Sequence, residues 1–262
     1  MRKRATILLP LLAALFLTAC LSDFDTPKVA REGSFAIELA EDSLVEEVET
    51  RAARELNYGE ASEYLVTLTH GAEVIWKEKL FKDITQADRI QPLGNSYVVM
   101  AEDVTKDEAE STNNGWGCLR YAGQSDAFSI VANQTTHVTV PCRMANAGLR
   151  VYFDSSFTDF FTDYAVTTDD IRGLKFCSNN GDIAYYNTDA TTKTRAVPVI
   201  ISASAGWEGT VRLTRTINLQ AGKIIRLNVR LNSPEPTEGN ITLSISYDDE
   251  FKEGTNTEIF LE

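Results

Sequence analysis

Residues 211–231 read VRLTRTINLQAGKIIRLNVRL, and this stretch decides the fold class. The apolar positions are Val211, Leu213, Ile217 and Leu219, then Ile225, Leu227, Val229 and Leu231, and polar residues fill most of the positions between them. Alternation with a period of two is typical of a β-strand that buries one face and exposes the other. The segment Gln220–Lys223 separates the two runs, and it predicts a hairpin turn.

The same alternation recurs along most of the chain. It is seen in Phe35-Ile37-Leu39, Tyr64-Val66-Leu68, Leu149-Val151-Phe153 and Ile241-Leu243-Ile245-Tyr247. Strands with one apolar face are the antiparallel pattern, and two packed sheets bury such faces. We therefore expect an all-β chain of two tandem antiparallel β-sandwich modules, residues 33–142 and 143–262. Since no Gly/Ser-rich or Pro-rich stretch separates them, we expect a stiff junction.

One segment fits two structures. Glu41 to Asn57 is rich in Glu, Ala, Leu and Arg, and its apolar residues have helical spacing. It fits an amphipathic helix, or a strand over residues 43–50 followed by a loop. The pattern alone leaves both open.

The first twenty residues have the organisation of an export signal. Basic residues 2–4 precede an apolar run over residues 7–16, which is too short to cross a bilayer as a helix. The following Leu17-Thr18-Ala19-Cys20 resembles the bacterial lipobox. That resemblance implies a signal peptide of residues 1–19 and a lipidated Cys20, followed by a tether over residues 20–32.

Acidic residues directly after Cys20 are relevant to where in the cell envelope the protein is located. Asp23 and Asp25 resemble the acidic export signal of Bacteroidetes surface lipoproteins, which implies an outer-membrane lipoprotein on the cell surface. A solvated tether explains the same residues. The whole chain has a formal charge of −13, and removal of three basic residues and no acid with residues 1–19 gives −13 − 3 = −16. This charge disfavours nucleic-acid partners and electrostatic adhesion to anionic lipid.

The side chains that carry chemistry in enzymes are sparse here. His70 and His137 have no Cys or acid at ligand spacing, and the acidic run Asp248-Asp249-Glu250 lacks the spacing of a calcium loop. We expect neither a metal, nor a cofactor, nor catalysis. The residues with ligand-binding potential are the aromatic Trp116, Tyr121 and Trp207, because such rings stack on sugars or anchor protein partners.

Three cysteines follow Cys20 in the chain. An odd number cannot form a complete disulfide framework in an oxidising compartment. Cys118, Cys142 and Cys177 fit small buried hydrophobic residues, and a Cys118–Cys142 bridge is a second interpretation.

Several segments together resemble one protein family. Residues 92–101 (PLGNSYVVMA), 116–130, 138–147 (VTVPCRMANA), 157–166 (FTDFFTDYAV) and 183–186 (IAYY) are similar, in this order, to the fimbrillin-like lipoproteins of Bacteroidetes. The resemblance implies two tandem transthyretin-like sandwiches, anchored by lipid and acting in cell adhesion. Pilins of this family polymerise when one subunit's strand completes a neighbour's sheet, and an arginine-specific protease releases their first strand. In this chain Arg51 and Arg54 are the candidate processing sites.

Taken together, the sequence predicts a non-catalytic, lipid-anchored surface protein that acts in cell adhesion or is associated with fimbriae. The last strand is long enough to complete its own module, which favours a stand-alone, tip or anchor protein over a polymerising subunit. The alternative is a glycan-binding accessory lipoprotein of a polysaccharide-uptake system. The expected partners are the membrane, through Cys20, and either a protein bound by strand addition or a glycan.

Overall fold

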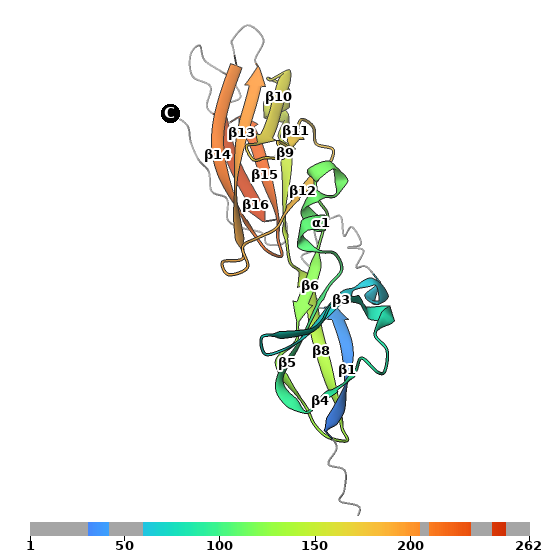
Figure 1. The fold of residues 1–262 in the computed structure, drawn as a ribbon. Helices are drawn as coiled ribbons and strands as arrows, with labels where there is room; N and C mark the ends of the chain where they lie inside the picture. The colour runs from blue at the N-terminus through green and yellow to red at the C-terminus, as the bar shows by residue number, and fades with distance from the viewer. Residues whose placement is uncertain (1–30, 42–59, 205–209, 232–242, 250–262) are drawn as a thin grey trace, which may run out of the picture.

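The computed structural model describes residues 31–41, 60–204, 210–231 and 243–249, and within these ranges the chain is predominantly β-strand (Figure 1). The all-β class predicted from the alternation is confirmed. The first half holds β1 (Glu32–Glu41), β2 (Leu65–His70), β3 (Glu73–Leu80), β4 (Ile90–Pro92), β5 (Gly94–Glu102), β6 (Tyr121–Gln124), β7 (Phe128–Ile130) and β8 (Thr135–Met144). The second holds β9 (Ala147–Phe153), β10 (Asp163–Thr168), β11 (Lys175–Phe176), β12 (Ile183–Tyr186), β13 (Thr194–Ser204), β14 (Thr210–Gln220), β15 (Ile224–Leu231) and β16 (Leu243–Asp249).

Short helices link some of these strands. They are the α-helices α1 (Lys106–Ser111) and α2 (Ser155–Thr158) and the 3-10 helices η1 (Ala61–Glu63), η2 (Phe81–Asp83) and η3 (Asn113–Gly115). Helix α1 begins after Thr105, whose hydroxyl accepts a hydrogen bond from the backbone N–H of Glu108. This is the usual way to satisfy a free donor at a helix N-terminus.

Strands β1–β8 join one hydrogen-bonded sheet, here called the N-terminal sheet. Its order is β3-β2-β5-β6-β8-β1-β4, and β7 pairs with β5. The apolar face of these strands forms one core, to which Phe35, Val66 and Val99 each contribute an almost fully buried side chain. The inward positions predicted for Phe35, Ile37, Tyr64, Val66 and Leu68 are confirmed.

Strands β9–β16 form a second unit, here called the C-terminal sandwich. One sheet has the order β11-β10-β13-β14 and the other β12-β9-β15-β16. Both contribute to a second core, in which Leu149, Phe153, Leu219 and Leu227 are buried. Each of these residues lies at an apolar position of the alternating pattern.

The expectation of purely antiparallel pairing is wrong for two strand pairs. Strand β1 runs parallel to β8 over eight residue pairs, from Ser34–Thr135 to Glu41–Cys142. Strand β9 runs parallel to β15 over six. Both pairs join strands far apart in the chain, as parallel pairing requires. A period of two marks only which side chains face the core, so it does not determine strand direction.

The hairpin predicted at Gln220–Lys223 is also wrong. The turn is present, and Gly222 has the positive φ of +79° that favours glycine. However, β14 pairs with β13, whereas β15 pairs with β9 and β16 in the other sheet. The turn therefore carries the chain from one sheet to the other. An alternating pattern on both sides of a short turn fits this connection as well as a hairpin.

The chain passes from the N-terminal sheet to the C-terminal sandwich between Met144 and Ala147. This crossing lies next to the predicted boundary at residue 143, and a division into two independently folding modules remains a prediction. The three cysteines in the described part of the chain are unbridged: Cys142 is buried, Cys118 is half-buried and Cys177 is exposed. The small-hydrophobe interpretation is therefore confirmed for Cys142 and wrong for Cys177.

Several sequence predictions lie outside the described residues. These are the signal peptide, Cys20 and the tether up to residue 30, most of the 41–57 segment with Arg51 and Arg54, Trp207, Glu250 and the chain beyond it. Asp248 and Asp249 end strand β16. Among the residues that the structure does describe, no helix has both the length and the apolar character needed to span a membrane.

Candidate functional site

A groove lies where the N-terminal sheet meets the C-terminal sandwich, and we call it the junction groove. Its volume is about 770 Å³. The sheet contributes Leu65, Thr67, Val74, Lys77, Glu78, Met100, Ala101, Glu102, Ala122, Gly123 and Gln124; helix α1 and the segment between it and β6 contribute Lys106 and Arg120; the crossing to the sandwich contributes Ala145; and the loop after β12 contributes Asn187, Thr188, Asp189, Ala190 and Lys193.

The floor of the groove is the outer face of β2, β3, β5 and β6. Residues alternate across these strands, so Val66, Val99 and Ala101 are buried while Thr67 and Met100 point the other way. Two apolar side chains remain open to solvent there: Val74 is 53% exposed and Met100 is 37% exposed. The register that pairs Met100 with Gln124 sets an amide beside the thioether. The floor thus offers both apolar contact and hydrogen-bonding groups.

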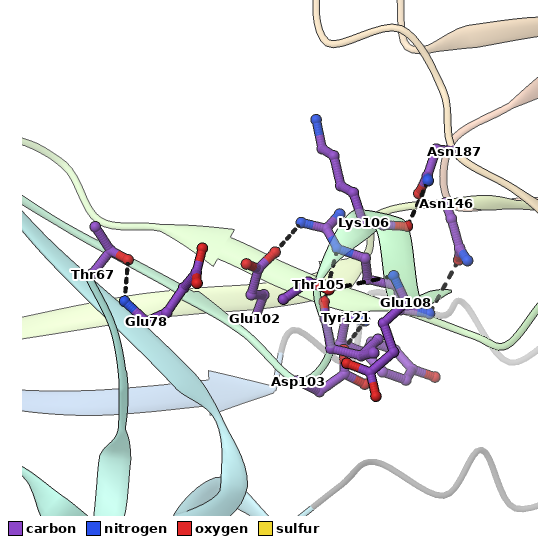
Figure 2. A network of polar contacts seen from close by, with 12 residues as sticks. Thr67, Glu78, Glu102, Asp103, Thr105, Lys106, Glu108, Tyr121, Asn146 and Asn187 are labelled. Carbon is purple, nitrogen blue, oxygen red and sulfur yellow. Dashed lines mark hydrogen bonds and ion pairs between the residues drawn. The ribbon is translucent and has the colours of Figure 1, made fainter. Parts of the chain in front are cut away.

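A bulge in β3 shapes one side of the groove. Pairing of β2 with β3 shifts between Val66 and Leu68, so Lys77 and Glu78 stand opposite Thr67 alone. Glu78 adopts a φ of +51°, and its N–H donates to the hydroxyl of Thr67 (3.0 Å), as Figure 2 shows. The bulge projects Lys77 and Glu78 from the sheet edge, where they form an ion pair at 2.9 Å.

A buried arginine fixes the end of the groove next to α1. Arg120 is 7% exposed; its Nη2 pairs with Glu102 at 2.5 Å, and its Nε donates to the carbonyl of Val104 at 3.1 Å. The adjacent Asp103 accepts the N–H of Tyr121. Burial raises the pKa of Asp103 above its ordinary value, although this N–H and the charge of Arg120 oppose the rise.

The opposite wall comes from the loop that follows β12. Asn187 donates to the carbonyl of Lys106 (2.7 Å) and to the carboxylate of Glu110 (2.9 Å), which attaches the loop to α1. Asp189 closes the loop by accepting the N–H groups of Thr192 and Thr191 and the hydroxyl of Thr192. These hydrogen bonds, the backbone N–H of Thr192 foremost, hold the pKa of Asp189 below its usual value.

The charge of the groove differs from that of the chain. Its lining holds four basic residues (Lys77, Lys106, Arg120, Lys193) and three acidic ones (Glu78, Glu102, Asp189), a balance of 4 − 3 = +1, against −13 for the whole chain. Figure 2 shows the side chain of Lys106 extending away from Glu102. Cations, amides and open apolar atoms together suit a polar, extended ligand with hydroxyl or acidic groups.

Arg172 joins the segment after α1 to the C-terminal sandwich. Arg172 Nη1 donates to the carbonyl of Gly115 (2.9 Å) and to that of Tyr185 (2.8 Å), and its guanidinium lies 3.8 Å from the centre of the Tyr186 ring. The N–H of Tyr185 donates to the carbonyl of Trp116 at 2.7 Å. These bonds fix the segment after α1 against the C-terminal sandwich, and the stiff junction remains a prediction.

Of the aromatic residues singled out from the sequence, two lie in packed positions. Trp116 is half-buried, and its ring meets Phe176 edge-on at 4.9 Å in the second core. Tyr121 is 3% exposed in the first core. A ligand in solvent does not reach the Tyr121 ring, and Trp116 has a packing role. The fold does not bring these two rings into the groove, and Trp207 lies outside the described residues.

The histidines occupy separate positions. His70 stacks on Tyr97 with ring centroids 4.2 Å apart, and His137 is exposed on β8. Among the described residues no three His, Cys, Asp or Glu side chains come together in a metal-binding group.

The groove residues could not be recognised from the sequence because they come from six separate segments of the chain. One local signal was available: Thr105-Lys106-Asp107-Glu108 has the Thr-x-x-Glu spacing of a helix N-terminal capping box. It marks helix α1 and so places Lys106 at a helix start. Nothing in the sequence indicates that Asn187 approaches it.

Sheet edges are the second candidate surface, because an unpaired strand accepts an added strand. Edge strand β3 carries the bulge together with Lys77 and Lys79, and both features obstruct pairing. Edge strand β14 is different: it pairs with β13 over eleven residues without a register shift. In the described part of the chain, its other side has no strand partner.

Comparison with known proteins places the chain in a family. The family model described as "Domain of unknown function (DUF4493)" matches residues 31–261. No curated protein matches the chain. A fimbrial assembly protein from Parabacteroides distasonis has a similar solved structure, with 12% identity and a TM-score of 0.43, and the match covers 84% of this chain and 99% of that one. The fimbrial anchor protein Mfa2 from Porphyromonas gingivalis matches with 11% identity, a TM-score of 0.37, and coverage of 83% and 97%.

Proposed function

The chain belongs to the DUF4493 family, and we propose that it is a lipid-anchored surface protein that acts by binding, in cell adhesion or as a fimbria-associated component. The lipid is attached to Cys20, and the N-terminal sheet and C-terminal sandwich project from it as one body. Several acyl chains make such attachment effectively permanent, because each buried methylene contributes about 0.8 kcal/mol.

The observation that carries this proposal is the place where the chain enters the fold. Strand β1 begins at the end of the N-terminal sheet that is farthest from the C-terminal sandwich (Figure 1). An anchor eleven residues before Arg31 (31 − 20 = 11) spans at most about 40 Å. The membrane is thus held near one end of the molecule, and the sandwich is displayed at the other.

The strand pairing within the sheets indicates how a protein partner binds. Strand β1 fills its own place beside β8, with Phe35 and Ile37 in the core. Strand β16 pairs with β15 over seven residues. Because these positions are occupied by the chain itself, we propose a stand-alone, tip or anchor role, with β14 as the edge that accepts a partner's strand.

Anchoring is tested with an alkyne-bearing palmitate fed to expressing cells. The native chain is expected to incorporate the label and to partition with membranes, whereas Cys20→Ser is expected to do neither. Cys177→Ser is the matched control, since it removes an exposed thiol and leaves Cys20 in place. Equal labelling of the native chain and Cys20→Ser would contradict the anchor.

Glycan binding is the second candidate, and the junction groove favours it. Thr67, Gln124 and Asn187 supply hydrogen-bonding groups beside the open Val74 and Met100 side chains. A glycan array is expected to report a ligand whose signal falls at least about tenfold in the variant Lys106→Glu with Gln124→Ala, the loss of roughly two hydrogen bonds. Lys175→Glu, on β11 outside the groove, is the control. An array without signal, or with equal signal for all three chains, would count against this candidate.

A further inference from the structure

The end of the N-terminal sheet at which the chain enters carries exposed apolar side chains. We call it the base pole and define it as residues 31–34, 89–93 and 131–134. Ile90 is 44% exposed, Leu93 39% and Val131 44%. Pro92, between the first two, is exposed as well. Apolar side chains of this size are seldom left open in a group without a partner.

Backbone contacts bring these residues together around the start of β1. Ile90 pairs with Ser34 in the register of β1 and β4. The N–H of Leu93 donates to the carbonyl of Arg31 at 3.0 Å. A Cβ on Gly33 would lie 2.3 Å from the carbonyl oxygen of Val131, so the turn after β7 lies directly against β1. All three side chains therefore belong to one end of the sheet.

The net charge of the base pole suits a bilayer surface better than the net charge of the whole chain does. Its residues include Arg31, Arg89 and Glu32, a balance of 2 − 1 = +1, against −13 for the whole chain. The net charge of the chain opposes electrostatic attachment to anionic lipid. At this end, however, no excess of acidic side chains repels the headgroups, and apolar contact is available.

From these observations we propose that the base pole rests in the membrane interface, with Ile90, Leu93 and Val131 inserted among the headgroups. The inference rests on the proposed function, because the anchor at Cys20 brings this end to the bilayer. Three half-exposed side chains bury too little apolar surface to hold a free protein on a membrane. A short tether changes this, because it gives the pole an effective concentration near the surface in the millimolar range.

Insertion of the base pole gives the molecule a defined orientation relative to the bilayer. A tether of eleven residues alone lets the molecule tilt freely, whereas a tether and an inserted pole fix two points of contact. The C-terminal sandwich and the junction groove then stand away from the bilayer.

The test uses a tryptophan at the pole and vesicles whose phosphatidylcholine carries bromine on its acyl chains. The chain from Cys20 onward, which includes every described element, receives a hexahistidine tag before residue 20 and is bound to a nickel-chelating lipid. Leu93→Trp is the probe, and Ile171→Trp, in the C-terminal sandwich at a fully exposed position, is the matched control. The signal of the parent chain is subtracted.

Interfacial side chains reach about 5–10 Å into the bilayer. Bromine is therefore expected to remove about half of the emission that Leu93→Trp adds and to leave the emission that Ile171→Trp adds unchanged. Equal quenching of the two introduced tryptophans on bound chains would overturn the inference.

Further variants test whether the quenching depends on the apolar side chains of the base pole. Adding Ile90→Ser and Val131→Ser to the Leu93→Trp chain is expected to restore the emission of the introduced tryptophan, and Val131→Trp repeats the probe if Leu93→Trp fails to fold. Because the tag supplies the tether, this result does not depend on acylation. Absence of lipid on Cys20 in cells would contradict the proposed anchor, whereas equal quenching on the tagged chain would contradict insertion of the pole even if the anchor is present.

Discussion

Asn146 lies buried at the crossing between the two units. It is 1% exposed, and its side chain accepts the N–H of Arg120 (3.2 Å) and donates to the carbonyl of Cys118 (2.7 Å). Its own carbonyl accepts the N–H of Gly222. One side chain thus bonds the strand crossing to the segment after α1.

Replacing Asn146 by Ala leaves a buried N–H and a buried carbonyl without partners, each costing about 1–3 kcal/mol. We expect the free energy of unfolding to fall by about 2–4 kcal/mol, measured by chemical denaturation. Asn95→Ala, at an exposed position, is the control and is expected to change it by less than about 0.5 kcal/mol. Equal stability of the two variants would show that the side-chain bonds of Asn146 are dispensable.

Asp88 gives the fold a defined sensitivity to acid. Hydrogen bonds from Lys79 at 2.6 Å, from the Thr85 hydroxyl and from the Thr85 N–H lower its pKa from 3.8 to about 2. Because the pKa of Asp88 is lower in the folded chain than in the unfolded one, its carboxylate stabilises the fold fully above pH 3.8. This stabilisation is lost as the pH falls towards 2. The group is partly open to solvent, so its contribution is about 1 kcal/mol.

We therefore expect Asp88→Asn to lower stability at pH 7 by about 1 kcal/mol and to make little difference at about pH 2. Thermal unfolding at both values measures this. The control is Asp83→Asn, a neighbouring exposed carboxylate for which no hydrogen bond from a side chain is seen among the described residues. A difference between the native chain and Asp88→Asn that grew on acidification would contradict the assignment.

At the scale of the element, the contacts of β1 determine whether proteolytic cleavage can vacate the position that β1 occupies in the N-terminal sheet. It joins β8 over eight residue pairs and places Phe35 and Ile37 in the core. After cleavage of the chain at Arg51 or Arg54, we expect β1 to remain bound, because those contacts do not involve the cut. Gel filtration and mass spectrometry of the nicked chain measure retention.

A variant with Phe35→Ser and Ile37→Ser is the comparison for that experiment, since it removes the buried side chains and keeps the backbone pairing. It is expected to lose the β1 fragment after cleavage. Spontaneous release of the native β1 fragment would instead favour a polymerising subunit whose vacated position takes a partner's strand.

The elements also show what sequence patterns determine. Alternation identified the strands and their buried faces, because a half-buried strand needs an apolar residue at every second position. It could not tell the sheet-to-sheet turn at Gly222 from a hairpin, or the parallel β1–β8 pair from an antiparallel one, since both depend on distant partners. The junction groove was not predicted for the same reason: Lys106 and Asn187 meet only after both units have folded.

At the scale of the whole molecule, we expect rigidity between the two units to depend on Arg172. Its bonds to Gly115 and Tyr185 and its stacking on Tyr186 hold the segment after α1 against the sandwich. We expect Arg172→Leu to raise the amide hydrogen-exchange rate of residues 113–118 about tenfold or more, as the loss of a charged hydrogen bond implies. Arg212→Leu, exposed on β14, is expected to have no effect there, and equal exchange in both variants would contradict a role for Arg172.

The central claim is that the chain is held at the cell surface by Cys20 with the C-terminal sandwich outermost. Cys177 tests it most directly, because its thiol is exposed in that sandwich whereas Cys142 is buried. A membrane-impermeant maleimide applied to intact cells is expected to label the native chain much more strongly than Cys177→Ser, which retains only the half-buried Cys118 and the buried Cys142, and Cys20→Ser is expected to be missing from the cell surface. Labelling of Cys177 only after lysis would contradict the account.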